Sequence, residues 1–126
     1  MGTPSVGDAV IIPFPYSDLS QSKRRPALVL AGVGKDDFLL CQITSKQYDD
    51  SHALSLNESD FLSGSLRQDS FIRIGKLFTA NETLIAGVAV HNKSAKIAET
   101  IAHLIEILSA WLQDETFYHP DTENGS

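Results

Sequence analysis

Three consecutive cations stand directly before a proline near the start of the chain. Lys23, Arg24 and Arg25 precede Pro26, and the apolar run Ala-Leu-Val-Leu follows at once. Proline lacks a backbone donor and disfavours helix in the residue before it, so we expect Arg25 to be extended at the entrance of a strand. A guanidinium held there could bind a phosphate. Without further context, the segment is more often a basic hairpin loop that keeps a sheet edge soluble.

The other reactive side chains show no spacing typical of a metal site or of an activated nucleophile. The single cysteine, Cys41, lies in the apolar run 38–43, which predicts a buried thiol in a reducing compartment and no disulfide framework. Each histidine is interpreted as a surface or half-buried residue, although one follows the Asp49–Asp50 turn near the candidate site; they are His52, His91, His103 and His119. We therefore expect no metal and no cofactor.

Length, composition and charge limit the possible classes of protein. The chain has 126 residues and 42% hydrophobic content, which fits one compact domain, and it contains no signal peptide or membrane-spanning run. We expect a soluble cytoplasmic protein. The net charge of -6 argues against a general polyanion binder. However, part of the acidity lies in the last residues, and the body carries cations in two segments that could converge: Lys23, Arg24 and Arg25, then Arg67, Arg73 and Lys76.

Short apolar runs punctuated by glycine and proline predict a set of strands. The runs are residues 9–14, 26–31, 38–44, 53–56, 71–74 and 83–90. Pro13 and Pro15 are expected to end regular pairing of the first strand, and the polar residues 16–23 to form a long loop. Residues 58–63 could form one helical turn that Gly64 ends.

One long helix is predicted to close the domain, with Ser94 as its cap. Apolar residues recur at spacings of three and four and should pack on the strands as a lid; they are Ile97, Ile101, Leu104, Ile105, Leu108, Trp111 and Leu112. The opposite face is polar and carries Lys96, Glu99, Thr100, His103 and Glu106. We expect residues 1–113 to form the domain and residues 114–126 to be an acidic, disordered tail. The fold class is mainly β, a strongly curved sheet or partly open barrel with a C-terminal helix.

Three segments, in order, resemble the PemK/MazF family of toxin endoribonucleases. They are GDAVIIPFPYSDLSQSKRRPALVL, QITSKQYDD and FLSGSLRQDSFIRIGKLFT, and the resemblance runs from Gly7 to about Leu112. It implies a small SH3-like barrel of the PemK/MazF/CcdB type and a symmetric homodimer. It also implies metal-independent cleavage of single-stranded RNA, in which the 2′-hydroxyl attacks to leave a 2′,3′-cyclic phosphate, and inhibition by a cognate antitoxin.

The resemblance assigns roles to particular residues. The family's arginine before the proline matches Arg25, and its threonine at the end of the third strand matches Thr44. A guanidinium and a hydroxyl donor could oppose the charge that develops on a phosphate. Arg73 is the third candidate catalytic residue, although it could equally be a surface charge at a strand end. Some members carry an aspartate two residues later, where this chain has Gly75, so the general base is not identified. Residues expected to bind RNA are Ser22, Lys23, Arg24, Lys46 and Lys76.

Two other functions remain open. The first is a non-catalytic barrel of the same family that binds protein or nucleic acid without cutting it, which the glycine at position 75 and the acidic balance favour. The second is an unrelated SH3-like peptide-binding module, which would need an aromatic groove built from Tyr16, Tyr48 and the phenylalanines.

Overall fold

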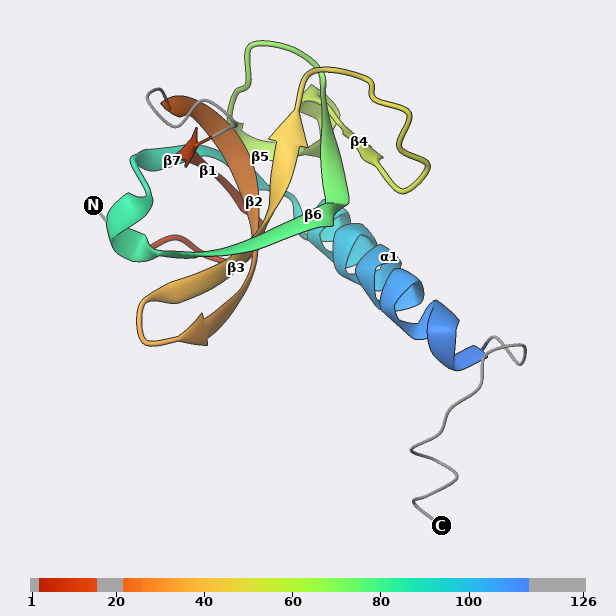
Figure 1. The fold of residues 1–126 in the computed structure, drawn as a ribbon. Coiled ribbons are helices and arrows are strands. Elements are labelled where there is room, and N and C mark those ends of the chain that lie inside the picture. Colours follow the sequence, from red (N-terminus) through yellow and green to blue (C-terminus); the bar gives the residue numbers. More distant parts are fainter. Residues whose placement is uncertain (1–2, 16–21, 114–126) are drawn as a thin grey trace.

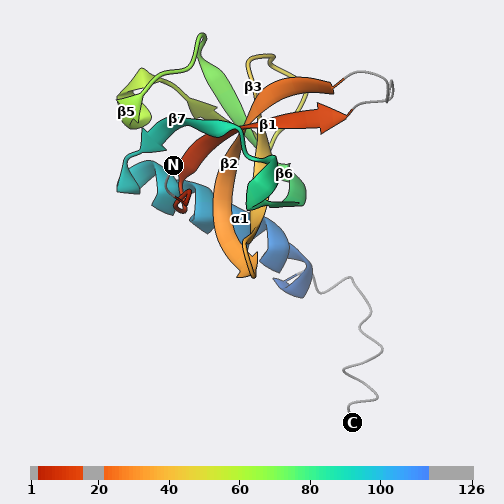
Figure 2. The same ribbon diagram turned by 90° about the vertical axis from the view of Figure 1, so that its left-hand side faces the viewer.

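The protein is built on one curled antiparallel sheet with a single helix packed against it (Figures 1 and 2). The computed structural model describes residues 3–15 and 22–113. The elements in chain order are β1 (Asp8–Pro15), β2 (Ser22–Gly34), β3 (Asp37–Thr44), β4 (Leu54–Leu56), the 3₁₀ turn η1 (Glu58–Asp60), β5 (Phe61–Gly64), β6 (Ser70–Asn81), η2 (Glu82–Leu84), β7 (Gly87–Asn92) and α1 (Ser94–Gln113).

The strand order explains how distant segments become neighbours. The seven-stranded sheet has the order β4-β6-β3-β2-β1-β7-β5, and each strand pairs antiparallel with its neighbours. β3 therefore lies between β2 and β6, and the short strands β4 and β5 form the two edges. This arrangement confirms the predicted mainly-β fold, a partly open barrel with a C-terminal helix.

Apolar side chains alternate between the two faces of the central strands and form two clusters. Ala9, Leu28 and Cys41 belong to one cluster, while their chain neighbours Val10, Val29 and Leu40 belong to the other. Because successive side chains of a strand point to opposite faces, the clusters lie on opposite sides of the sheet. Leu104 and Ile107 of α1 pack against the first cluster, and Phe78 and Ile85 pack against the second. Cys41 is fully buried, as predicted.

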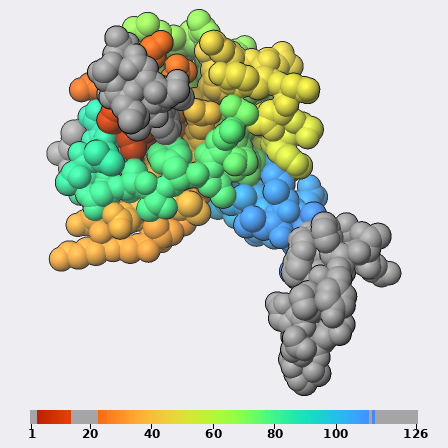
Figure 3. Space-filling view, in the orientation of Figure 1, coloured from red at the N-terminus to blue at the C-terminus, as the bar shows by residue number. Residues whose placement is uncertain are grey.

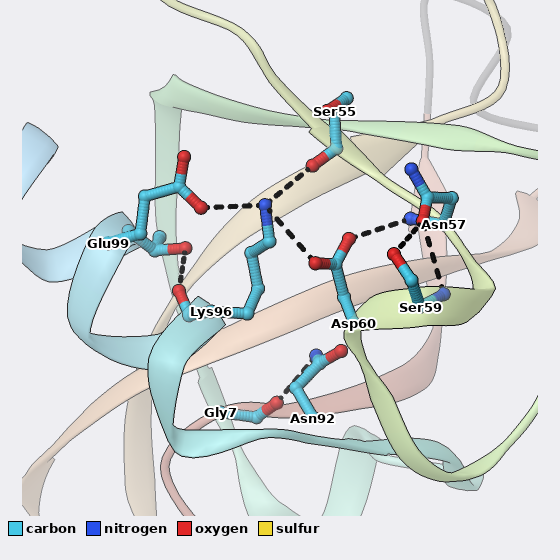
Figure 4. A network of polar contacts seen from close by, with 9 residues as sticks. Gly7, Ser55, Asn57, Ser59, Asp60, Asn92, Lys96 and Glu99 are labelled. Carbon is cyan, nitrogen blue, oxygen red and sulfur yellow. Dashed lines mark hydrogen bonds and ion pairs between the residues drawn. The ribbon is translucent and has the colours of Figure 1, made fainter.

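A buried lysine fastens the start of α1 to the sheet (Figure 4). The Lys96 side chain is 8% exposed, and its Nζ lies 2.7 Å from Glu99 Oε1 and 3.6 Å from Asp60 Oδ1. Nζ also donates to the Ser55 carbonyl oxygen at 3.0 Å. The other carboxylate oxygen of Asp60 accepts from the Asn57 amide at 2.9 Å, which caps η1. The lysine thus joins α1 to β4 and η1.

The assignment of Lys96 and Thr100 to the polar, outer face of the helix was wrong. Both are buried, whereas Ile105, Leu108 and Leu112, predicted to pack as a lid, are 59%, 63% and 70% exposed. The helix is buried at its first turns, where oxygen acceptors surround Lys96 and the Thr100 hydroxyl donates to the Lys96 carbonyl at 2.8 Å. Its second half extends past the strands (Figure 1). In the described part of the chain, no helix is long and apolar enough to cross a bilayer.

The prolines of β1 do not end its pairing, contrary to the prediction. Pro13 pairs with Arg24 and Pro15 with Ser22. β7 pairs only with residues 8–11 of β1, so one side of the later residues is a free edge, where a missing N–H breaks no ladder. As a result β2 begins at Ser22, and Arg25 lies within the strand rather than at its entrance.

The segment after residue 56 also differs from the prediction. The predicted turn at 58–63 is a 3₁₀ turn of three residues, followed by the unpredicted strand β5. Gly64 ends β5 with a φ of +90°, and a Cβ there would overlap the Ala89 carbonyl oxygen, so the close approach to β7 requires glycine. β6 continues to Asn81, and β7 starts only at Gly87, after η2. Most of the predicted loop and the whole predicted tail lie outside the described residues.

Candidate active site

The three residues proposed as catalytic line one cavity. Arg25 of β2, Thr44 at the end of β3 and Arg73 of β6 surround a space of about 230 Å³, completed by Gln42, Tyr48 and Lys76. The three strands are adjacent in the sheet, with β3 in the middle. The cavity is therefore built by residues that are far apart in the sequence but lie at one end of three neighbouring strands.

Strand register explains this convergence. Gln42 of β3 pairs with Ala27 of β2 on one side and with Arg73 of β6 on the other. Arg25 precedes Ala27 by two residues and Thr44 follows Gln42 by two residues, so both lie toward the same end of the ladder. In β6 the register jumps between Arg73 and Leu77, which leaves residues 74–76 as a bulge. Bulges redirect side chains, and this bulge contains Gly75 and Lys76.

Thr44 is a buried residue at the centre of the site. It is 5% exposed, and its Oγ1 accepts a hydrogen bond from the Lys46 amide at 3.1 Å. Since a hydroxyl both accepts and donates, the hydroxyl hydrogen can still be given to a bound anion. Thr44 also lines the two neighbouring hollows, so it stands where they meet.

The guanidinium of Arg73 is held from three sides. Its Nε donates to Asp50 Oδ2 at 3.1 Å, and its Nη1 donates to Gln42 Oε1 at 3.4 Å. Its Cζ lies 4.4 Å from the centre of the Tyr48 ring, a cation–π contact. Side-chain exposure is 17% for Arg73 and 15% for Asp50. Arginine offers five N–H donors, and the two hydrogen bonds use one on Nε and one on Nη1.

The ionisation of Asp50 follows from these contacts. Burial acts to raise the pKa of Asp50, but it is outweighed by the hydrogen bonds from Arg73 and from the His52 amide and by the charge of Arg73, so the pKa lies below its ordinary value of 3.8. The carboxylate is therefore ionised at neutral pH. Its second oxygen, Oδ1, accepts from the His52 amide at 3.0 Å.

A larger groove of about 540 Å³ adjoins the cavity and shares Arg25 and Thr44 with it. Its cationic lining comes from Lys23, Arg24 and Arg25 of β2 and from Arg67, which lies between β5 and β6. Its apolar lining includes Ile11, Pro26, Ile43, Leu66 and Ala89. The two cationic segments of the sequence are thus brought to one region. A smaller hollow of about 100 Å³ shares Thr44, Tyr48 and Arg73 with the main cavity and also includes Lys46 and Asp50.

The connection between β3 and β4 supplies residues that the sequence did not assign to the catalytic site. Figure 3 shows this connection, in yellow, as a continuous surface beside the green of β6. Tyr48 and Asp50 come from it, and Gln42 comes from β3. The only local signal was their nearness to Thr44 in the string QITSKQYDD.

The other residues predicted to bind RNA lie in β2 and in two of the hollows. Ser22 belongs to β2, and its side chain lies outside the described part of the structure. Lys46 lines the small hollow and Lys76 the main cavity. The Ser70 hydroxyl donates to the Gln68 carbonyl at 2.9 Å. No group of three or more His, Cys, Asp or Glu side chains among the described residues could hold a metal ion.

The three histidines in the described part of the chain do not line the main cavity. The His52 ring is 5.9 Å from the ring of His103, and His91 Nδ1 lies 2.7 Å from Asp8 Oδ1. None of these three residues lines the cavity around Arg25, Thr44 and Arg73. His119 lies outside the described residues.

No family model matches the sequence, and no curated protein sequence is similar to it. The structure, however, resembles solved structures. A MazE–MazF complex of Deinococcus radiodurans has a TM-score of 0.67 at 20% identity, over 87% of this chain and 99% of that chain. An endoribonuclease of a mycobacterial species, in complex with its cognate antitoxin, has a TM-score of 0.65 at 14% identity, over 85% and 96%. For the Mycobacterium tuberculosis toxin MazF-mt6 the TM-score is 0.59 at 14% identity, over 79% and 92%.

These likenesses define the class of fold, a small, partly open β-barrel with a C-terminal helix. Nearly the whole length of each solved chain is covered, so the match is to a complete domain and not to a shared fragment. The fold is that of the MazF structures, as the sequence resemblance predicted.

Proposed function

We propose that this chain is the toxin of a type II toxin–antitoxin system and acts as a metal-independent endoribonuclease on single-stranded RNA. The observation that carries the proposal is the convergence of Arg25, Thr44 and Arg73 on one cavity, in a chain with the fold of MazF structures. Endoribonuclease activity and binding to an antitoxin are described for proteins of this fold.

The proposed reaction is an internal transesterification. The 2′-oxygen of one nucleotide bonds to the adjacent phosphorus and loses its proton to water, while the bond from phosphorus to O5′ breaks and O5′ takes up a proton from water. The products are a 2′,3′-cyclic phosphate and a free 5′-hydroxyl. Arg25 and Arg73 oppose the charge on the phosphate oxygens, and the Thr44 hydroxyl donates to one of them. Arginine does not serve as the base, because it does not deprotonate in proteins.

The larger groove is the proposed path of the RNA strand next to the cleaved bond. Its cations, Lys23, Arg24 and Arg67, would contact phosphates, and its apolar lining would receive the faces of bases. Binding should therefore weaken as the salt concentration rises. A cognate antitoxin with an acidic segment would bind the same cations, as the resemblance implies, and so compete with RNA.

The decisive test is cleavage of single-stranded RNA by the purified protein with a chelator present. We expect cutting, with 2′,3′-cyclic phosphate ends detected by mass spectrometry. Arg25→Lys should lower kcat, with a loss of about 2–4 kcal/mol of transition-state stabilisation, because an ammonium cannot replace the planar fork of donors. A matched control is Lys35→Arg, an exposed residue between β2 and β3, which should cleave like the wild type.

Two results would contradict the proposal. Cleavage that chelation abolishes and magnesium restores would exclude the metal-independent mechanism, and unchanged turnover in Arg25→Lys would return Arg25 to the role of a surface cation. RNA binding without any cleavage would favour the second candidate, a non-catalytic barrel. One observation supports that candidate, since Gly75 provides no carboxylate at the position where some family members have an aspartate.

We also propose that the protein is a homodimer. Ile105, Leu108 and Leu112 form an exposed apolar stripe on α1, and pairing about a twofold axis is the commonest way in which soluble proteins cover such a surface.

A further inference from the structure

The connection between β3 and β4 brings a carboxylate to the cavity that the strands alone do not supply. Asp50 is separated from Arg73 by 23 residues, yet the two side chains share a hydrogen-bonded ion pair at 3.1 Å. Both side chains are largely buried, so water competes weakly for this contact. Most surface ion pairs contribute little, but this one is enclosed and has a directed geometry.

The contacts of Asp50 leave it little freedom. One oxygen accepts from Arg73 Nε and the other accepts from the His52 amide, while the Asp50 backbone carbonyl accepts from the Ala53 amide at 3.2 Å. The Asp50 amide donates to the Tyr48 carbonyl at 2.8 Å, so the residue that stacks on Arg73 is tied to the residue that pairs with it. These hydrogen bonds therefore hold the Asp50 carboxylate and the Tyr48 ring beside the Arg73 guanidinium.

The hydrogen bonds to Arg73 decide which of its N–H groups are left to bind a ligand in the cavity. Nε donates to Asp50 and Nη1 donates to Gln42, and Arg73 has no other side-chain acceptor among the described residues. The other Nη hydrogens of Arg73 are therefore left for the cavity, which Arg73 lines together with Arg25 and Thr44. Asp50 itself is a poor proton acceptor at neutral pH, because its pKa lies below 3.8.

We infer that Asp50 is a positioning residue, which fixes the Arg73 guanidinium so that its outer N–H groups point at the phosphate held by Arg25 and Thr44. The inference rests on the proposed ribonuclease function. It also gives the chain a carboxylate partner for Arg73 although position 75 is glycine. The carboxylate acts through Arg73 and does not exchange a proton with the substrate.

The experiment is a double-mutant cycle on cleavage of a single-stranded RNA oligonucleotide, with kcat and KM measured separately. Asp50→Ala should lower kcat about 10- to 100-fold, as expected for a misplaced group. Arg73→Ala should lower kcat at least as much. The double variant should be no slower than Arg73→Ala alone, because the carboxylate has no guanidinium left to position. Asp50→Asn should lose less activity than Asp50→Ala but should be slower than the wild type, since its amide oxygen can accept from Nε while its NH₂ group cannot accept from the His52 amide.

Asp49→Asn is the matched control, because Asp49 is the exposed neighbour of Asp50, and it should cleave like the wild type. Thermal midpoints of all variants check that they are folded, and Asp50→Asn keeps the side-chain shape if Asp50→Ala unfolds. Equal activity of Asp50→Ala and Asp49→Asn, or losses from Asp50→Ala and Arg73→Ala that simply add, would overturn the positioning role.

A non-cleavable 2′-O-methyl oligonucleotide separates this inference from the proposed function. If the wild type binds this oligonucleotide but cleaves no RNA, the ribonuclease proposal fails, and Asp50→Ala must still weaken binding as much as Arg73→Ala does for the positioning role to stand. If the wild type cleaves but Asp50→Ala is unaffected, only the positioning role fails. If it neither cleaves nor binds, both are overturned.

Discussion

The thiol of Cys41 lies in the middle of β3 and is completely enclosed by the first apolar cluster. Burial raises the pKa of Cys41 from 9.0 to about 12. The thiolate is the reactive form of cysteine, so the folded protein should be inert to thiol reagents at neutral pH. The reactivity of this thiol is therefore set by its burial in the fold.

The same burial makes stability depend on pH in alkaline solution. The unfolded chain loses the thiol proton near pH 9, whereas the folded chain keeps it until about pH 12, so the unfolded state gains relative stability between these values. The wild type should lose up to about 1.4 kcal/mol per pH unit more than Cys41→Ala over the lower part of this range. Urea unfolding of both proteins at pH 8, 9 and 10 measures the difference, and parallel pH dependences would contradict it.

At the scale of elements, attachment of α1 to the sheet depends on the buried ammonium of Lys96. Its partners come from β4, η1 and the helix itself, so loss of the charge leaves the Ser55 carbonyl and the Asp60 carboxylate without their donor. Gly7, at the start of β1, lies so close to the helix that an added Cβ would overlap Ile97. The junction is thus both polar and tightly packed.

Lys96→Met should therefore lower the free energy of unfolding by roughly 2–4 kcal/mol, since it leaves a partly buried carboxylate unpaired. Urea denaturation should show a lower midpoint with an unchanged slope. Lys93→Met, an exposed lysine one turn earlier, is the control and should unfold like the wild type. Equal midpoints for the two variants would mean that the packing alone holds the helix.

Local signals predicted those parts of the fold and site that depend on neighbouring residues. Pro26 marks β2, the apolar run before Thr44 marks β3, and the spacing of isoleucine and leucine marks α1. Burial of Lys96 was not predictable in this way, because the Ser55 carbonyl to which it donates lies 41 residues away in the chain. Asp50 was missed for the same reason, since its role depends on a pairing across 23 residues.

At the scale of the whole molecule, the exposed stripe on α1 predicts self-association. Light scattering at micromolar concentration should give about twice the chain mass of 13.7 kDa. Leu108→Glu should shift the protein toward the monomer, because Leu108 is 63% exposed and a charge there opposes apolar contact. Val33→Glu is a control, since Val33 is 52% exposed but lies in the β2–β3 hairpin, away from α1 in sequence. A wild type that is monomeric over a wide concentration range would contradict the dimer.

The two open edges of the sheet have a consequence for colloidal behaviour. An unpaired strand edge is a template for addition of further strands, and long flat edges promote fibrils. Here the outermost strands are β4 and β5, which have only three and four residues, and β5 stops at Gly64, whose backbone conformation breaks an extended run. The free side of β1 beyond Ile11 includes Pro13 and Pro15, which have no N–H to offer a further strand. The barrel thus remains open without offering a long template, and concentrated solutions of the folded protein should resist fibril formation.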